Sequence, residues 1–99
     1  MEQEFSVNAA ERYGIGCAII LNHFHHDLYK IPSGGKYWSK ANRDDFSKKF
    51  PYLTRKEVWS AVRKLEREGL IESRHERTIP FSKTSWYAVT DKGREIAVG

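Results

Sequence analysis

The chain has 99 residues, 39% hydrophobic and 13% aromatic, and its formal net charge is +4. This length and apolar content predict one small folded domain and exclude a disordered chain or two independent domains. No apolar run approaches the roughly 18 residues of a membrane span, the acidic start lacks the pattern of a signal peptide, and the single cysteine closes no internal disulfide. We therefore expect a cytoplasmic protein that does not enter a membrane.

The positive charge is unevenly distributed along the chain. Residues 36–94 contain 15 Lys and Arg against 8 Asp and Glu, whereas residues 1–35 contain 2 against 4. A basic surface attracts anionic partners such as the phosphates of nucleic acid. We expect any such partner to bind the second two thirds of the chain.

The first predicted element is a helix over about residues 9–29. Its apolar residues recur every three or four positions, as on a helix with one buried stripe: Tyr13, Cys17, Ile20, Leu21, Phe24 and Leu28. Gly14 and Gly16 weaken its first half, so a break near Gly14 is the alternative. The glycines and proline of IPSGGK (31–36) end the helix, and the aromatic residues 37–39 are compatible with a short edge strand.

A second helix is predicted over about residues 43–49. Asn42 is a suitable N-cap, and Asp44 and Asp45 fall in the first turn, where the helix dipole favours acids. Pro51 cannot continue a helix, so this helix is short.

The third helix, over about residues 55–68, has the clearest boundaries. Thr54 and Glu57 have the spacing of a capping box, in which each side chain accepts a hydrogen bond from the other residue's backbone amide. Gly69 follows as a left-handed stop.

Two extended segments, 70–76 and 83–90, then predict a β-hairpin over about 70–90, with Pro80 in its loop. Thr90 and Asp91 are positioned to cap a short last segment, DKGREIAV, which Gly93 keeps from being a long helix. The predicted fold class is α+β, mainly α, with three helices and a two- to three-stranded antiparallel sheet. This order of elements is typical of a winged helix-turn-helix.

Two stretches resemble known families. KYWSKANRDDFSKKFPYLTRKEVWSAVRKLEREGLIESR is similar to a block in winged-helix domains of phage and plasmid replication and regulatory proteins. The shared positions are Trp38, Phe50, Pro51, Leu65, Glu66, Gly69, Leu70 and Ile71. WYAVTDKGR (86–94) resembles the segment that closes the wing in MarR- and PadR-like regulators, with Val89 where leucine is usual. The resemblance covers roughly residues 37–94 and implies a winged-helix fold, but its positions are mostly packing and turn residues and do not identify a target.

The third helix has two distinct faces when its residues are placed at about 100° steps. One face carries Val58, Ala61, Val62 and Leu65, and the opposite face carries Lys56, Ser60, Arg63 and Arg67 with no acid among them. The alternative is an ordinary solvated face, since surface helices often carry Lys and Arg. In a winged helix-turn-helix the N-terminal half of this helix enters the major groove, where Arg and Lys bind guanine O6 and N7.

The resemblance to winged-helix domains then assigns candidate contacts to DNA. The candidates for contact with base edges are Arg55, Lys56, Trp59, Ser60 and Arg63. The candidates for contact with phosphates are Lys48, Lys49, Arg67, Arg74, His75, Arg77 and Lys83. Trp59 lies at the border of the two faces, so shielding of the core is its alternative role. Lys64 and Glu68, four residues apart, are spaced for an ion pair.

No catalytic or metal site is expected. HFHHD (23–27) places His23 and Asp27 one helical turn apart, but zinc usually requires three or four ligands, and a polar helix face is the more common explanation. The sequence contains no phosphate-binding glycine loop, no HExxH and no CxxC, so we expect neither an enzyme nor a cofactor.

The expected function is sequence-specific binding of double-stranded DNA by a small phage or mobile-element protein, acting in transcription regulation or DNA replication. The alternative is a protein-binding adaptor or inhibitor built on the same scaffold, because several aromatics fall outside obvious core positions: Trp38, Trp59, Phe81 and Trp86. By analogy with related domains we also expect a homodimer through the first helix.

Overall fold

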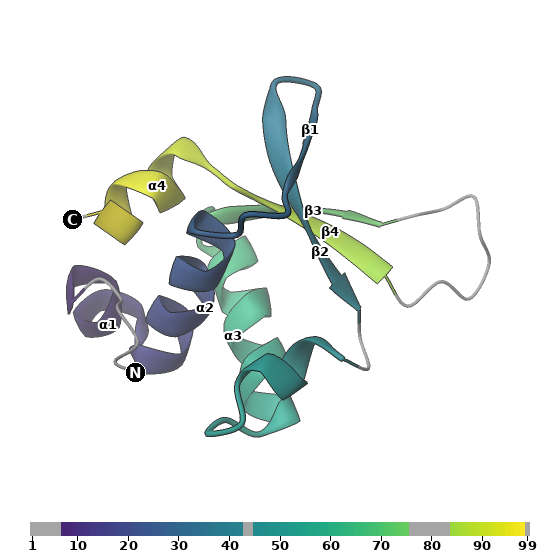
Figure 1. Cartoon of the computed structure of the whole chain (residues 1–99). Coiled ribbons are helices and arrows are strands. Elements are labelled where there is room, and N and C mark those ends of the chain that lie inside the picture. Colours follow the sequence, from purple (N-terminus) through teal and green to yellow (C-terminus); the bar gives the residue numbers. More distant parts are fainter. Residues whose placement is uncertain (1–6, 43–44, 76–83, 99) are drawn as a thin grey trace.

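The computed structural model describes residues 7–42, 45–75 and 84–98 (Figure 1). The fold is α+β, as predicted, but the described part contains four α-helices and a four-stranded antiparallel sheet, more elements than expected. In chain order these are α1 (Val7–Tyr13), α2 (Ile15–His25), β1 (Ile31–Ser33), β2 (Lys36–Asn42), the 3-10 turn η1 (Phe46–Lys49), α3 (Arg55–Arg67), β3 (Ile71–His75), β4 (Thr84–Val89) and α4 (Asp91–Val98).

The single helix predicted over residues 9–29 is wrong, and the alternative of a break near Gly14 is confirmed, because two helices, α1 and α2, occupy this region. Gly14 separates them with φ of 98°, a backbone conformation that side-chain-bearing residues rarely adopt. The second helix ends at His25, and beyond it the backbone amide of Tyr29 donates to the Asp27 carboxylate at 3.0 Å. Leu28 was expected in the buried stripe but is 90% exposed, since it lies outside the helix.

The aromatic segment expected at a sheet edge is part of a longer, inner strand. The sheet order is β1-β2-β4-β3, so β2 pairs on both sides. Its partner β1 joins it through a two-residue turn at Gly34 and Gly35, whose φ values of 60° and 78° suit a tight hairpin. The sequence analysis recognised the turn but not the strand before it.

The helix predicted over residues 43–49 is also wrong in extent, because only the 3-10 turn η1 forms. Asn42 does not cap it, because the extended backbone of β2 continues to Asn42. Asp45 occupies the N-cap position, but its side chain makes no capping hydrogen bond, and Asp44 lies outside the described residues. The buried rings of Phe46 and Phe50 hold η1 against the core.

The third helix agrees closely with the prediction. The hydroxyl of Thr54 accepts from the Glu57 amide at 3.1 Å, and the Thr54 amide donates to the Glu57 carboxylate at 3.0 Å, so both bonds of the capping box are present. Gly69 adopts φ of 78°, and the Leu70 amide donates to the Leu65 carbonyl at 2.9 Å. The helix therefore has well-defined ends on both sides.

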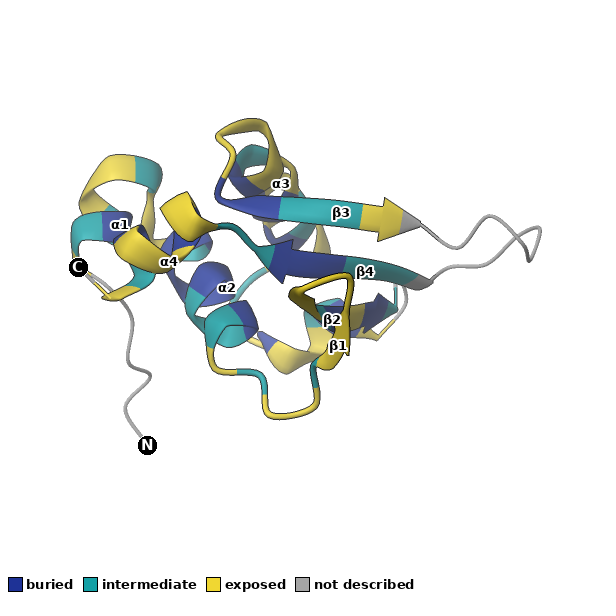
Figure 2. Ribbon diagram, turned by 90° about the horizontal axis from the view of Figure 1, so that it is seen from above, coloured by how far each residue is buried: buried dark blue, intermediate teal, exposed yellow. Residues whose placement is uncertain are grey.

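The helices pack on one face of the sheet. One continuous core joins the inward side chains of β2, β3 and β4 to those of α2, η1 and α3. Its members from the sheet are Ala41, Ile71 and Tyr87, and those from the helices include Ile20, Leu21, Phe24, Phe46, Val58, Val62 and Leu65. In the view from above, β2, β4 and β3 are seen with no described helix crossing over them (Figure 2). We call this uncovered side the outer face of the sheet.

The predicted hairpin over residues 70–90 is confirmed for its described strands, since β3 and β4 are antiparallel neighbours. The chain then enters α4, where Thr90 accepts a hydrogen bond from the Gly93 amide at 3.0 Å, as the predicted cap requires. Thr90 also donates to the Gly69 carbonyl at 2.6 Å. These bonds attach α4 to the end of α3. None of the helices in the described ranges is long and apolar enough to cross a membrane.

Candidate nucleic-acid interface

The two faces predicted for α3 are present in the structure. Its inward residues are buried, with Val58 0%, Val62 2% and Leu65 1% exposed. The residues of the opposite face are all exposed: Lys56, Ser60, Arg63 and Arg67. We call these four the α3 basic face. Within the described ranges its three cations form no ion pair, so their charge is uncompensated.

Tertiary contacts fix the orientation of α3. The Cys17 thiol on α2 approaches the Ala61 carbonyl at 3.8 Å, and burial raises the pKa of this thiol although Lys64 and Arg67 oppose the shift. Lys64 donates to the Tyr13 carbonyl at 3.1 Å. Among the described residues it does not form the ion pair with Glu68 that the spacing of the two residues predicted. At the C-cap of α3, Lys92 donates to the Glu68 carbonyl at 3.0 Å, where a helix C-terminus favours a cation. These bonds hold the basic face in a fixed direction.

Trp59 belongs largely to the core side of α3. Its half-buried indole lies 5.5 Å from the Phe46 ring, and its Nε1 is buried without a hydrogen-bond partner among the described residues. The shielding role considered for this residue therefore has a direct contact to support it.

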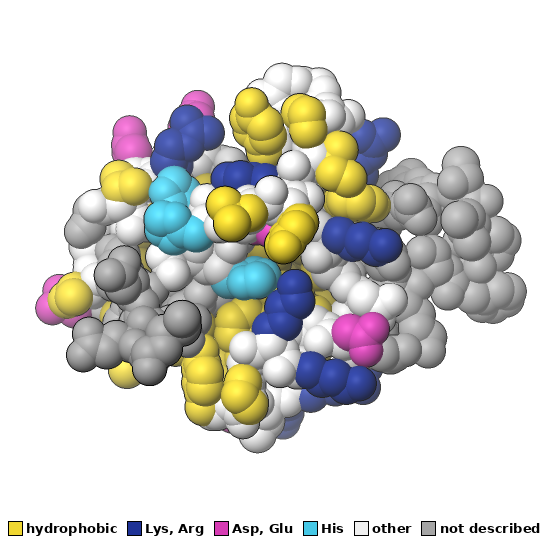
Figure 3. Space-filling model, viewed as in Figure 1, with side chains coloured by type: hydrophobic (Ala, Val, Ile, Leu, Met, Phe, Trp, Pro, Cys, Tyr) yellow, Lys and Arg dark blue, Asp and Glu magenta, His cyan; other side chains and the backbone are white. Residues whose placement is uncertain are grey.

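The lysines of η1 extend the basic surface beside α3. Lys48 and Lys49 are exposed, and η1 contacts α3 directly. Lys48 lies 3.4 Å from the Asp45 carboxylate, but both side chains are well exposed and such pairs contribute little. Arg55 is exposed in the first turn of α3. Figure 3 shows Lys and Arg side chains along the side of the molecule that carries η1.

The structure places Arg74, another phosphate candidate, apart from this surface. Arg74 is exposed on β3, and by the alternation of the strand it projects from the outer face, opposite the side on which Ile71 meets α3. His75 is paired with Ser85 through the backbone register, and its side chain lies outside the described residues. Arg77 and Lys83 lie outside them altogether.

The sequence analysis missed one basic residue, Lys40. The register places Lys40 and Arg74 on either side of Trp86. The predicted strand covered only residues 37–39, whereas β2 continues to Asn42 and so includes Lys40.

The histidine-rich segment at the end of α2 forms no metal cluster, since no three His, Cys, Asp or Glu side chains gather in the part of the chain that the structure describes. His23 instead packs edge-on against Phe46 and Phe50, with ring centroids 5.6 and 5.4 Å away. Its burial, together with the charge of Lys49, lowers the pKa of His23, while Asp27 opposes the shift. This environment therefore favours the neutral form of the His23 imidazole.

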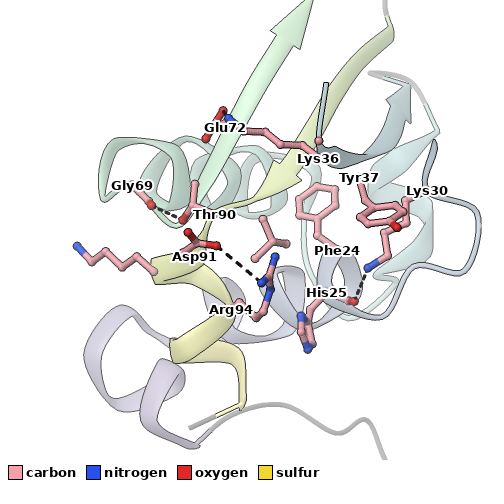
Figure 4. Close-up of a pocket in the computed structure, with 13 residues that line it drawn as sticks. Phe24, His25, Lys30, Lys36, Tyr37, Gly69, Glu72, Thr90, Asp91 and Arg94 are labelled. Atoms are coloured by element: carbon pink, nitrogen blue, oxygen red, sulfur yellow. Dashed lines mark hydrogen bonds and ion pairs between the residues drawn. The ribbon is translucent and has the colours of Figure 1, made fainter. Parts of the chain in front are cut away.

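A hollow of about 610 Å³ lies between the end of α2, the β1–β2 hairpin and the start of α4 (Figure 4). Its charged side chains already have partners. Lys36 pairs with Glu72, Arg94 lies 3.7 Å from Asp91, and Lys30 donates to the His25 carbonyl at 3.0 Å. The hollow thus has little free charge with which to bind an ionic ligand.

Comparison of the chain with protein-family models, with curated proteins and with solved structures found no match.

Proposed function

We propose that the protein is a winged helix-turn-helix protein that binds double-stranded DNA sequence-specifically through α3. The order of elements supports this proposal: a helix, a strand, a turn, the amphipathic helix α3 and an antiparallel hairpin whose second strand pairs back with β2. Two features depart from the expected pattern, because η1 is a single 3-10 turn and β1 is an additional strand.

The observation that carries the proposal is the exposed, acid-free α3 basic face. Lys56 and Arg63 project from the N-terminal and middle turns of a helix whose ends and inward side are fixed. In this architecture those turns lie in the major groove, where Lys and Arg bind guanine O6 and N7 and a hydroxyl such as that of Ser60 bonds either base edge. Lys48, Lys49 and Arg67 then contact the flanking phosphates, which fixes the register but not the sequence. Of the remaining candidates, Arg55 is a further base contact. The candidates for contact with phosphates from the β3–β4 hairpin are Arg74, His75, Arg77 and Lys83.

The biological setting we propose is transcription control or replication initiation in a phage or mobile element. It rests on the resemblance of the sequence block around α3.

The test is binding to duplex DNA at two salt concentrations. A labelled random duplex should bind with micromolar affinity at 50 mM salt and much more weakly at 200 mM, because each neutralised phosphate releases a counterion. Selection of bound sites from a random duplex pool should then return a consensus. Absence of duplex binding at low salt would overturn the proposal, and binding without any consensus would remove its sequence specificity.

A second candidate is a protein-binding adaptor, and a group of exposed apolar side chains favours it. Leu28 is 90% exposed, Tyr29 89%, Ile31 52% and Tyr37 60%. Figure 3 shows hydrophobic side chains gathered over the β1–β2 hairpin and the segment that leads into it. Exposed patches of this kind mark protein interfaces.

The same apolar group is the place to test the expected homodimer. Leu28 and Tyr29 support little of the core, so the double substitution Leu28→Gln, Tyr29→Gln should leave folding intact. Sedimentation equilibrium should show a weaker dimer for this variant than for the native chain. A native chain that sediments as a monomer at high concentration would exclude this interface for self-association.

A further inference from the structure

The outer face of the sheet carries a tryptophan between two cations. The register pairs Trp86 of the inner strand β4 with Lys40 on one side and with Arg74 on the other. Side chains directly opposite each other in antiparallel strands lie about 5 Å apart at their β-carbons. Both cations are exposed, and within the described ranges neither has an ion-pair partner.

The neighbouring row adds a second indole. Because Ser39 pairs with Tyr87, Trp38 falls beside Ala88, whose other neighbour is Glu72. The indole of Trp38 is held in place by a hydrogen bond from its Nε1 to the Ser33 carbonyl at 3.1 Å. Ala88 is only 2% exposed, so its side chain is covered where it lies on this face.

Neither indole is needed to fill the core. Trp38 and Trp86 are half-buried but do not belong to the core cluster or to the residues packed against it. Glu72 is the one acid that the described strands place on this face, and it is already paired with Lys36. No described helix covers the face (Figure 2). Two half-buried indoles are therefore accompanied by two unneutralised cations.

These features together favour a partner that presents flat aromatic surfaces and negative charge in alternation. Single-stranded nucleic acid has this chemistry, because its unpaired bases stack on aromatic side chains while Lys and Arg contact its phosphates. In duplex DNA the bases are stacked on one another and cannot meet an indole. An acidic peptide would satisfy the cations but has no base to stack on the indoles.

We propose that Trp86 and Trp38, with Lys40 and Arg74, form a second site that binds single-stranded nucleic acid on the outer face of the sheet. This site is independent of the duplex binding proposed for α3, because α3 packs on the opposite side of the same sheet. The two activities can therefore be lost separately.

The first test is titration of a labelled oligo-dT strand with the full chain, followed by fluorescence anisotropy. Trp86→Ala should weaken binding by about 5- to 150-fold, the loss expected for one stacked base. Trp86→Phe should restore much of the affinity, because a phenyl ring also stacks and preserves the fold of the sheet. If Trp86→Ala does not fold, comparison of the native chain with Trp86→Phe and Trp86→Leu decides between stacking and simple apolar packing.

The second test separates charge from stacking. The double substitution Lys40→Gln, Arg74→Gln should reduce the slope of log affinity against log salt by about 1.4, at about 0.7 for each phosphate contact on a single strand. The matched control is Arg12→Gln, an exposed arginine on α1, which should leave the slope unchanged. Trp86→Ala, Trp86→Phe and Arg12→Gln should bind random duplex as the native chain does.

Three results would overturn the proposal. One is a native chain that does not bind oligo-dT at low salt. Another is oligo-dT binding that Arg63→Ala abolishes and Trp86→Ala does not, because the strand would then be held by α3. The third is a polyglutamate peptide that competes fully with oligo-dT and depends equally on Trp86, because the partner would then be an acidic protein.

Discussion

Gly93 lies directly against the backbone carbonyl of Leu70. A β-carbon at position 93 would overlap the Leu70 oxygen and lie 2.9 Å from its carbonyl carbon. The first turn of α4 can approach the segment between α3 and β3 so closely only because residue 93 has no side chain. This contact, with the bond from Thr90 to the Gly69 carbonyl, fixes the end of α3 relative to the sheet.

We expect Gly93→Ala to destabilise the protein by about 1–3 kcal/mol, because a methyl group inserted against backbone forces a shift of α4. The matched control is Gly16→Ala in α2, where an added β-carbon would make only an ordinary contact 4.0 Å from Ala61. Alanine is favoured over glycine in helices, so this control should raise stability by up to about 1 kcal/mol. Urea unfolding of both variants tests the prediction, and an equal effect of the two substitutions would contradict it.

The capping box of α3 predicts a second effect on stability. Thr54→Ala should lower the free energy of unfolding by about 1 kcal/mol, the usual cost of losing an N-cap hydroxyl. Thr54→Ser retains the oxygen and should cost much less. Unfolding curves of the two variants measure the difference, and similar losses for both would mean that the methyl group, not the cap, matters.

The partner carboxylate makes this contribution dependent on pH. Hydrogen bonding to Thr54 lowers the pKa of Glu57. The bond with the Thr54 backbone has the larger effect, and the bond with its side chain the smaller. A carboxyl group with a lowered pKa in the folded state stabilises the fold above its unfolded pKa, and this stabilisation is lost as the pH falls through the folded pKa. The stability difference between the native chain and Glu57→Ala should therefore shrink as the solution is acidified below about pH 4. A difference that stays constant with pH would show that the charge has no role.

His23 predicts a change of stability in a higher range of pH. Its pKa is lowered by burial and by Lys49, so the folded state favours the neutral imidazole. Below about pH 6.5 the imidazole of His23 binds a proton more readily in the unfolded chain than in the folded chain. The free energy of unfolding should therefore decline as the pH falls through this range. His23→Phe keeps a ring beside Phe46 and Phe50 but cannot be protonated. Its stability should decline less than that of the native chain between pH 7.5 and 5.5.

The matched control for this pH effect is His26→Phe, since His26 is exposed just beyond α2. This variant should lose stability with falling pH as the native chain does. Parallel unfolding curves of the native chain and His23→Phe at both pH values would contradict the assignment.

For the proposed DNA interface, we expect Arg63→Ala to weaken binding to the selected site by about 1–3 kcal/mol and to relax specificity at one base pair, as for a bidentate contact to guanine. Lys49→Ala should weaken specific and random duplex alike and reduce the salt slope by about 1. Arg77 is the residue expected to contact phosphate from the hairpin, and Arg77→Ala should behave in the same way. Arg12→Ala removes one positive charge on α1 and should change neither the affinity for duplex DNA nor the salt slope. Equal losses on specific and random DNA for Arg63→Ala and Lys49→Ala would contradict the division of roles.

The helix α3 was predictable because its signals are local. A capping box, a glycine stop and a 3.6-residue apolar period all lie within residues 54–69, and each acts through neighbours a few positions away. The buried stripe and the exposed basic face follow from that period alone. The β3–β4 hairpin and the cap of α4 by Thr90 were predictable for the same reason.

The elements that the sequence analysis misjudged depend on distant partners. The extent of β2 is set by its pairing with β1 on one side and β4 on the other, and this pairing takes Asn42 into the sheet, so that it does not cap a helix. The end of α2 and the exposure of Leu28 depend on where the chain must turn to begin β1.

The sequence by itself determined the α+β class, the two faces of α3 and the residues of the basic face, because periodicity and capping are encoded in short segments. Only the tertiary structure decided that Arg74 lies apart from that face, and that it joins Lys40 around Trp86. Strand register causes this difference, since a shift of one residue in pairing moves every side chain to the other side of a sheet. The register of three strands from distant parts of the chain is set by the packing of the common core, and no short segment records it.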